Sequence, residues 1–396
     1  MAESVIHFAN GGLKTPPPLS LYIHLPWCVR KCPYCDFNSH AAQDIPEAAY
    51  IDALLLDLEC ALPDIWGRKI QTVFFGGGTP SLFSAEGIDR ILTGVRTLTQ
   101  LTPGAEITLE ANPGTVEAAK FKGFREAGIT RISLGVQSFN PRHLQALGRI
   151  HDDSEARRAA ELAATHFDTF NLDLMYALPG QTLAEALSDI DIALGFQPPH
   201  LSAYHLTLEP NTAFGHTAPP KLPDEDLAAD MQQAIEARLT QAGMQHYETS
   251  AYARPHHASR HNLNYWQFGD YLGIGAGAHA KLSFHDRIVR QMRVKHPLQY
   301  MDAVKAGAHI VDARTLTRAD LPFEFMMNAL RLNDGVPAAL FGERTGLSLV
   351  VCAAALELAR GRGLLERDAL RLKPTQRGQH FLNDLLALFL ADEHVA

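Results

Sequence analysis

The sequence contains few cysteines. Its five cysteines are an odd number, and three of them lie between residues 28 and 35. The chain therefore lacks the paired framework of a small secreted protein that is stabilised by disulfides, and a reducing compartment fits it better. The other two, Cys60 and Cys352, are isolated in helical patterns, where we expect buried and inert thiols.

Long hydrophobic runs are also absent. No stretch of 18 consecutive apolar residues occurs, and no basic segment followed by an apolar stretch opens the chain. We therefore expect no signal peptide and no membrane-spanning helix. The expected location is the cytoplasm, and peripheral contact with a membrane is left open.

Basic residues are fewer than acidic ones. The 35 lysines and arginines stand against 44 aspartates and glutamates, which leaves a net charge of -9. This balance favours solubility and disfavours general binding of nucleic acid. With 396 residues, of which 46% are hydrophobic, the chain is long enough for a large core and a second domain.

Strand-like and helix-like segments alternate over the first 240 residues. The strand candidates are dense in apolar, β-branched and aromatic residues, which is typical of strands covered on both faces. They are 19–25, 72–76, 106–111, 131–136, 169–176 and 200–208, with helical patterns at about 47–62, 84–99, 115–126, 153–166, 182–196 and 223–242. Six successive units predict an α/β fold, a partial (β/α)6 barrel of the TIM type with a parallel sheet and helices outside.

The remaining segments suggest three domains or parts. Residues 1–18 end in a proline run and form a predicted N-terminal segment, and residues 19–295 form the predicted core domain with a β extension. Residues 296–396 form a smaller, mainly helical domain with a predicted hairpin at 364–372, in outline a winged helix. Its charges are mixed in sign, so we favour a docking or lid domain over DNA binding.

The most informative segment is Cys28-x3-Cys32-x2-Cys35. A structural zinc site and an ordinary four-iron cluster each require four protein ligands, whereas this segment supplies three thiolates. Three ligands on a cubane cluster leave one iron open to a substrate or cofactor. A zinc site completed by His24 or His40 is the alternative.

Unusual polar residues follow the predicted strands at their carboxyl ends, where the active site of a (β/α) barrel lies. The cysteine segment follows the first strand, the glycine turn 76–80 follows the second, and Glu110 and Asn112 lie at the end of the third. Gln137 follows the fourth strand and Asp173 lies in the fifth. The glycine turn matches neither a Walker nor a dinucleotide motif. Glu110 is costly in an apolar strand unless it is hydrogen-bonded or used, and a salt bridge inside the barrel is the alternative to a ligand.

Several motifs, in order along the chain, are similar to those of one protein family. The cysteine segment, with Tyr34 before its last cysteine, resembles the signature of radical S-adenosylmethionine (SAM) proteins. Further motifs over about residues 19–390 resemble the oxygen-independent coproporphyrinogen III oxidase group of that superfamily; they are 22–26, 76–81, 135–139 and 178–182. The resemblance implies a radical SAM barrel, bound SAM, and a [4Fe-4S] cluster on Cys28, Cys32 and Cys35.

The same resemblance assigns residues to SAM. The positions that match SAM contacts of the family are Tyr22, Gly78, Thr79, Glu110, Gln137, Arg149 and Asp173. Gly78 and Thr79 would contact the methionine part, and Arg149 would pair with its carboxylate. Ribose hydroxyls would satisfy Glu110. A tyrosine in a strand, such as Tyr22, is usually a core residue.

Two features separate the chain from the decarboxylating members of that group. Those members carry a further cysteine after the triad, where this chain has Phe37. The segment 261–266 (HNLNYW) matches the H-N-x-x-Y-W motif of a sister branch, the HemW haem chaperones. Imidazole is a normal ligand of haem iron and aromatic rings pack on a macrocycle, so the match implies haem at or near His261. A packed aromatic corner around His261 and Trp266 is the alternative.

The resemblance therefore implies a haem chaperone that transfers haem to haem-dependent proteins and carries a [4Fe-4S] cluster and SAM. The enzyme alternative is the oxidative decarboxylation of porphyrinogen propionates by a coproporphyrinogen III oxidase, which Phe37 disfavours. We assign no catalytic residue. A third hypothesis is a docking protein whose cluster is only structural. The expected partners are haem and haem-accepting proteins, within porphyrin metabolism, and a homodimer is left open.

Overall fold

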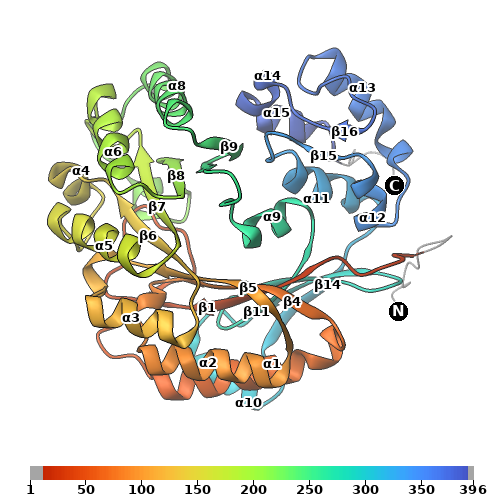
Figure 1. The fold of residues 1–396 in the computed structure, drawn as a ribbon. Helices are drawn as coiled ribbons and strands as arrows, with labels where there is room; N and C mark the ends of the chain where they lie inside the picture. The colour runs from red at the N-terminus through yellow and green to blue at the C-terminus, as the bar shows by residue number, and fades with distance from the viewer. Residues whose placement is uncertain (1–11, 391–396) are drawn as a thin grey trace.

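One curved sheet organises the molecule. The computed structural model describes residues 12–390; residues 1–11 of the predicted N-terminal segment and residues 391–396 of the predicted C-terminal domain lie outside the described residues. The sheet has 12 strands in the order β14-β13-β12-β11-β1-β4-β5-β6-β7-β8-β10-β9, and Figure 1 shows its curvature around an inner space. The predicted α/β fold is confirmed.

Six parallel strands form the curved wall of the partial barrel. They are β1 (Leu19–Leu25), β4 (Lys69–Gly77), β5 (Gln100–Ala111), β6 (Arg131–Gln137), β7 (Thr169–Tyr176) and β8 (His200–His205). Each pairs in parallel with its neighbour in this series. These are the six predicted strands, and β1 and β7 have the predicted bounds. Their apolar density is explained by burial, since helices cover the outer face.

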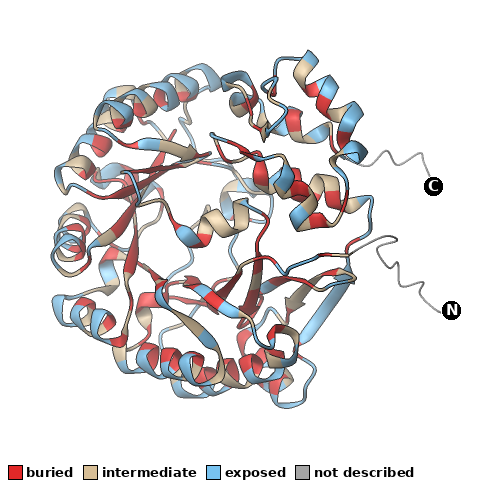
Figure 2. Cartoon of the chain, turned by 45° about the vertical axis from the view of Figure 1, so that its right-hand side comes forward, coloured by how far each residue is buried: buried red, intermediate tan, exposed pale blue. Residues whose placement is uncertain are grey.

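Helices cover the outside of this wall (Figure 1). The long ones are α1 (Glu47–Ile65), α2 (Ala85–Leu98), α3 (Ala118–Ala127), α5 (Asp153–His166), α6 (Leu183–Gly195) and α8 (Glu225–Gln241). Asp152 and Thr182 start α5 and α6 with capping boxes to Glu155 and Glu185, which satisfy free N–H groups of the first turn. Figure 2 shows the buried residues of these helices on the side that faces the strands.

The sheet continues beyond β1, and the alternating pattern does not predict this. β11 (Asp270–Ile274) pairs in parallel with β1, and β12 (His279–Ser283), β13 (Ile288–Arg293) and β14 (Ile310–Thr315) follow in antiparallel order. At the other edge, β10 (Ala251–Ala253) and β9 (Gln245–Glu248) extend the sheet from β8. Helix α10 (Pro297–Lys305) packs on α1. The predicted domain boundary at residue 296 stays a prediction.

Helix α9 (Arg260–Trp266) lies inside the curve of the sheet (Figure 1). The Thr72 hydroxyl on β4 lies 2.8 Å from Nδ1 of His261 and donates to Oγ of Ser20 on β1 at 2.8 Å. Asn264 Nδ2 donates to the same Ser20 oxygen at 2.9 Å, and the His261 N–H donates to Glu106 Oε1 at 3.0 Å. These bonds attach α9 to β1, β4 and β5.

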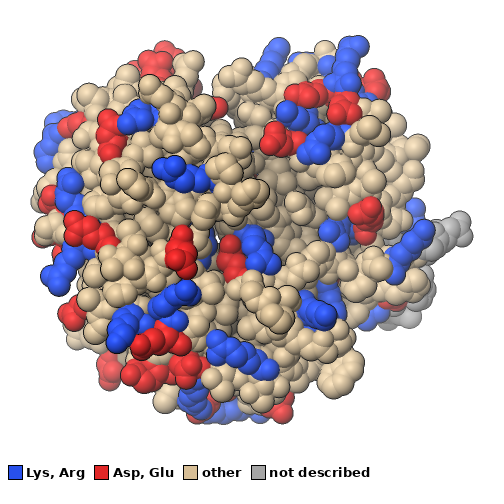
Figure 3. All heavy atoms as spheres, in the orientation of Figure 1, with Lys and Arg blue, Asp and Glu red and all other residues tan. Residues whose placement is uncertain are grey.

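The C-terminal part has a hydrophobic cluster of its own. Its helices are α11 (Asp320–Ala329), α12 (Ala339–Thr345), α13 (Ala353–Gly361), α14 (Gln376–His380) and α15 (Leu382–Ala387). The predicted hairpin at 364–372 is present in part and ends slightly later, because Leu365 pairs antiparallel with Pro374 and the Glu366 N–H donates to the Lys373 carbonyl at 2.9 Å. Within it, β16 (Arg371–Leu372) also pairs with the distant β15 (Val336–Pro337). The non-helical backbone of Phe381 separates α14 from α15. Figure 3 shows acidic and basic side chains interspersed over this face of the molecule.

The structure can be compared with the predictions about membrane-spanning helices and about the isolated cysteines Cys60 and Cys352. Within residues 12–390 no single helix has the length and apolar composition to cross a membrane; Ala339–Thr345 and Leu349–Gly361 pass that test only together, with a bend of 108°. Cys352 is buried as predicted, but Cys60 is exposed. The prediction for Cys60 is wrong because α1 turns Asp57 and Ala61 inward and leaves Cys60 on its outer face.

Candidate functional site

A cavity of about 430 Å³ lies at the carboxyl ends of the barrel strands. We call it the strand-end cavity. All three clustered cysteines line it, together with six of the seven residues assigned to SAM: Gly78, Thr79, Glu110, Gln137, Arg149 and Asp173. The parallel strands place these side chains at one edge although they are far apart in the sequence. The volume is within the range of about 300–1,000 Å³ that is usual for small-molecule sites.

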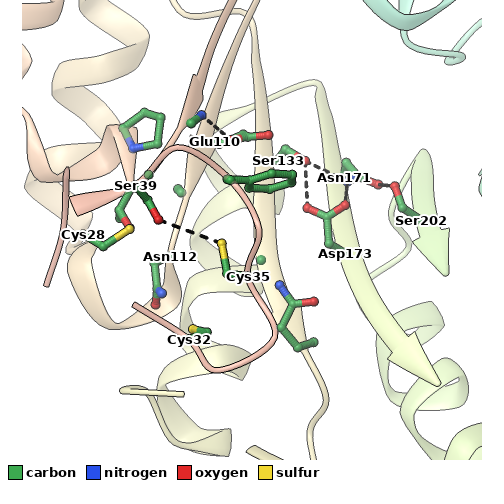
Figure 4. Close-up of a pocket in the computed structure, with 18 of the residues that line it drawn as sticks. Cys28, Cys32, Cys35, Ser39, Glu110, Asn112, Ser133, Asn171, Asp173 and Ser202 are labelled. Atoms are coloured by element: carbon green, nitrogen blue, oxygen red, sulfur yellow. Dashed lines mark hydrogen bonds between the residues drawn. The ribbon is translucent and has the colours of Figure 1, made fainter. Parts of the chain in front are cut away.

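The cysteine loop forms one side of this cavity (Figure 4). β2 (Trp27–Cys28) pairs with β3 (His40–Ala41), which folds the loop back on itself. The Thr79 hydroxyl donates to Cys28 Sγ at 3.4 Å, and the Arg149 guanidinium donates to Cys32 Sγ at 3.5 Å. Burial raises the pKa of the Cys28 thiol, and the Thr79 hydroxyl acts in the opposite direction. Donors of this kind favour the thiolate that binds metal.

The structure does not support a single zinc ion in the cysteine loop, and the [4Fe-4S] cluster stays a prediction. Tetrahedral zinc, with Zn–S bonds of about 2.3 Å, holds its sulfurs about 3.8 Å apart. Among residues 12–390, no three His, Cys, Asp or Glu side chains are placed to hold one metal ion. His24 is not free to complete a zinc site, because its Nδ1 lies 3.0 Å from Tyr22 Oη and its Nε2 lies 2.8 Å from the Asn38 carbonyl oxygen.

The glycine turn after β4 is shaped by packing against the cysteine loop. The Gly78 N–H donates to the Leu25 carbonyl at 2.8 Å, and the Thr79 N–H donates to the Trp27 carbonyl at 2.7 Å. A Cβ on Gly78 would lie 2.5 Å from that Trp27 oxygen. The close backbone approach is therefore to the chain itself, and the SAM contact of Gly78 and Thr79 stays a prediction.

Glu110 lies at the cavity with one hydrogen bond, from the Gly77 N–H to its Oε2 at 3.3 Å. In the described part of the chain no cation pairs with it, so the structure does not support the salt-bridge alternative. Burial, and next the Asp173 carboxyl, raise the pKa of Glu110 to about 8. Its remaining lone pairs, or its proton, are available to hydroxyl groups of a ligand.

A buried polar network faces the cysteines across the cavity (Figure 4). Ser133 Oγ and Asn171 Nδ2 donate to the Asp173 carboxylate at 3.0 and 2.7 Å. Ser202 Oγ donates to Asn171 Oδ1 at 3.1 Å, and His200 Nδ1 lies 2.7 Å from the same oxygen. The Asp173 carboxylate is thus held in one orientation, with its position set by three neighbouring strands.

Gln137 and Arg149 are also predicted to contact SAM. Gln137 lies at the end of β6, and Arg149 lies in the loop after α4 (Pro141–Ala146). Gln137 has a φ of 69°, a left-handed conformation that is uncommon for a residue other than glycine and is concentrated at functional sites. Arg149 Nη2 donates to the Gly135 carbonyl at 2.8 Å, and Nη1 donates to Tyr34 Oη at 3.4 Å. The guanidinium therefore lies between the cysteine loop and β6.

Sequence reasoning missed most of the wall of the cavity. The missed residues occupy every second position of β6, β7 and β8 and are Arg131, Ser133, Asn171, Met175, His200, Ser202 and Tyr204. Successive side chains of a strand point to opposite faces. The polar residues at alternate positions beside Gln137 and Asp173 were therefore a usable signal.

A second cavity of about 690 Å³ shares four lining residues with the first: Phe37, Ser39, Gly77 and Glu110. We call it the side cavity. Tyr22, predicted to contact SAM, lines this cavity instead, as does Tyr265 of the H-N-x-x-Y-W motif. The neighbouring strand β11, which pairs with β1, supplies Tyr271 to the same cavity.

His261 lines neither cavity and is 1% exposed. Its ring centroid lies 5.0 Å from that of Phe74 and 5.1 Å from that of Tyr265, and its Nε2 has no hydrogen-bond partner among the described residues. Trp266 lies 4.5 Å from the Arg331 guanidinium. His261 therefore packs among aromatic rings, as in the alternative to haem binding. Ligation of haem by His261 itself stays a prediction.

The buried imidazole of His200 predicts a loss of stability in acid. Burial, and next Arg131, lower the pKa of His200 well below its usual 6.5. Below pH 6.5 the unfolded chain takes up a proton at His200 that the folded chain does not, so stability is full above this pH and falls with acidification. Between about pH 7 and about pH 5, we expect the free energy of unfolding to fall less for His200→Gln than for the parent chain. Urea unfolding at both pH values measures this difference. Equal losses in both proteins would contradict this account; the exposed His380→Gln is the control.

Comparisons with known proteins agree with this geometry. The family model of the radical SAM superfamily matches residues 22–193, and that of the HemN C-terminal domain matches residues 316–381. The chain is 50% identical to the heme chaperone HemW of Escherichia coli and to that of Haemophilus influenzae, over 95% of this chain and 99% of each relative. The solved structure of coproporphyrinogen III oxidase (HemN) from Escherichia coli, described as a radical SAM enzyme, has a TM-score of 0.81 at 23% identity and covers 99% of this chain and 97% of that one.

Proposed function

Because the chain belongs to the HemW family, a branch of the coproporphyrinogen III oxidase-like group of radical SAM proteins, we propose that it binds haem and transfers it to haem-dependent proteins. The observation that carries the proposal is the 50% sequence identity to two relatives named heme chaperones, over 99% of the length of each. Phe37 supports it. This side chain is 59% exposed and lines both cavities, at the place where the decarboxylating enzymes keep another cysteine.

The proposal includes two resident cofactors at the strand-end cavity. Cys28, Cys32 and Cys35 would hold a [4Fe-4S] cluster, which supplies an electron source next to SAM when both are bound. The Arg149 guanidinium is positioned to pair with a carboxylate beside the cluster. Glu110 would exchange its single weak bond to Gly77 for ribose hydroxyls.

The oxidase is the second candidate, since its fold is the one that the chain shares. Decarboxylation of porphyrinogen propionates would also use a cavity beside the cluster. The exposed ring of Phe37 disfavours it, because no fourth thiol lines the strand-end cavity within the described residues. The cytoplasm stays the predicted location, and a homodimer and a docking or lid role of the C-terminal domain also stay predictions.

One sample tests both candidates. We expect the anaerobically reconstituted protein to bind haem with a Soret band and to pass it to a haem-free acceptor such as apo-cytochrome b. The same sample should give no protoporphyrinogen from coproporphyrinogen III under reducing conditions with SAM. Absence of haem binding would overturn the chaperone proposal, and steady product formation would establish the oxidase instead.

A further inference from the structure

The side cavity has the composition of a site for an anionic, metal-containing macrocycle. Tyr265 and Tyr271 form an aromatic wall, with ring centroids 4.4 Å apart. Lys31 and Lys295 line the cavity and are exposed. Within residues 12–390 neither ammonium has an ion-pair partner; Lys31 Nζ donates to the Phe37 carbonyl at 3.1 Å. Asp36 is the acidic residue at this wall besides Glu110.

Three imidazoles line this cavity, and their contacts distinguish them. Both nitrogens of His24 lie within 3.0 Å of other groups, Tyr22 Oη and the Asn38 carbonyl. His40 packs edge-on against His296, with ring centroids 5.3 Å apart, and its Nε2 is buried. His279, the first residue of β12, is exposed and makes no hydrogen bond with its side chain in the described part of the chain.

We propose that haem binds in the side cavity, with His279 as an axial ligand of its iron and Lys31 and Lys295 facing its propionates. The assignment rests on the proposed haem chaperone function and places the ligand that this function requires. Imidazole is an ordinary axial ligand of haem, and lysines pair with carboxylates. The rings of Tyr265 and Tyr271 are tilted by 56° to each other, so the face of one of them can pack on the macrocycle while the other closes the edge of the cavity.

The side cavity lies between the H-N-x-x-Y-W motif and the strand-end cavity, so haem bound there would lie next to both the motif and the proposed cluster. Tyr265 belongs to the motif and lines the cavity, while its ring also lies 5.1 Å from the buried ring of His261. The shared wall of Phe37, Ser39, Gly77 and Glu110 places haem next to the strand-end cavity.

Haem titration of four full-length reconstituted proteins tests the assignment. They are the parent chain, His279→Ala, His261→Ala and, as a matched control, the exposed His380→Ala. We expect His279→Ala to bind haem at least about tenfold more weakly, with a shifted Soret band. Free imidazole should restore the band in this variant, because it replaces the missing ligand; a merely structural role would not respond to imidazole. His261→Ala and His380→Ala should keep the position of the parent band.

The outcomes separate this inference from the proposed function. If the parent chain binds no haem, the chaperone proposal fails. If it binds haem and His279→Ala has the same affinity and spectrum, the assignment to His279 is overturned while the function stands. Loss of the band in His261→Ala with intact far-UV circular dichroism would also overturn it. The double variant Lys31→Glu, Lys295→Glu should weaken binding about fivefold without moving the Soret band, since it removes propionate contacts and keeps the iron ligand.

Discussion

We expect the replacement of Cys32 with serine to abolish the [4Fe-4S] cluster proposed for the cysteine loop. We expect the iron content after anaerobic reconstitution to fall from about four atoms per chain to near zero, together with the broad absorbance of the cluster. The cause is the number of ligands. Three thiols line the strand-end cavity and no fourth one does within the described residues, so the loss of one leaves two, too few to hold a cubane.

Cys32 is a suitable member of the triad to change. Its side chain is partly exposed, whereas Cys28 is buried, so the fold should survive its replacement. Cys60→Ser and Cys352→Ser are matched controls outside the loop and should retain full iron. Retention of about four irons by Cys32→Ser, measured by iron and sulfide analysis, would overturn the assignment of the cluster. Normal haem transfer by the iron-free variant would show that the cluster is dispensable for this function.

Replacing Asp270 with alanine should cost about 3–5 kcal/mol of folding free energy. Asp270 begins β11 and is fully buried. Its carboxylate lies 2.8 Å from Lys281 Nζ and 2.9 Å from Arg68 Nη1, and it accepts from Ser283 Oγ at 2.7 Å. Removing it leaves the Lys281 ammonium, 1% exposed, without a counter-charge.

A control variant at an exposed ion pair and a second change at Lys281 test whether the unpaired buried charge causes the loss of stability. Asp52→Ala breaks the exposed pair with Arg90 and should change stability by less than about 1 kcal/mol. The double variant Asp270→Ala, Lys281→Met should recover part of the loss, because it also removes the unpaired buried charge. Urea unfolding gives all three values. A cost for Asp270→Ala as small as that for Asp52→Ala would contradict the assigned role of this buried cluster.

The barrel was predictable because its signals are local. Segments dense in apolar and aromatic residues mark β1 and β7 to the residue, and the caps Asp152 and Thr182 lie where the helical patterns begin. Parallel strands then bring their carboxyl ends together. That general rule was sufficient to place Glu110, Gln137 and Asp173 around one cavity with the cysteines.

The second half of the sheet was not predictable in the same way. β11–β14 are held by pairing with β1 and with one another, over separations of up to about 250 residues along the chain. Their sequences alternate less clearly, and the buried ions Asp270 and Lys281 interrupt the apolar pattern. The two-residue strands β15 and β16 likewise pair with distant partners, which local propensity does not reveal.

The sequence by itself determined the fold class, the three-thiol loop and the set of residues at the strand ends, because these depend on short-range patterns and on one topological rule. Only the tertiary structure decided which way the side chains face. It buries His261 against Phe74, turns Tyr22 into the side cavity, and brings His279 to the same cavity from a strand that the alternating pattern did not predict. The physical reason is that the direction of a side chain follows from the register of its strand or helix against distant neighbours, which a motif of six residues does not contain.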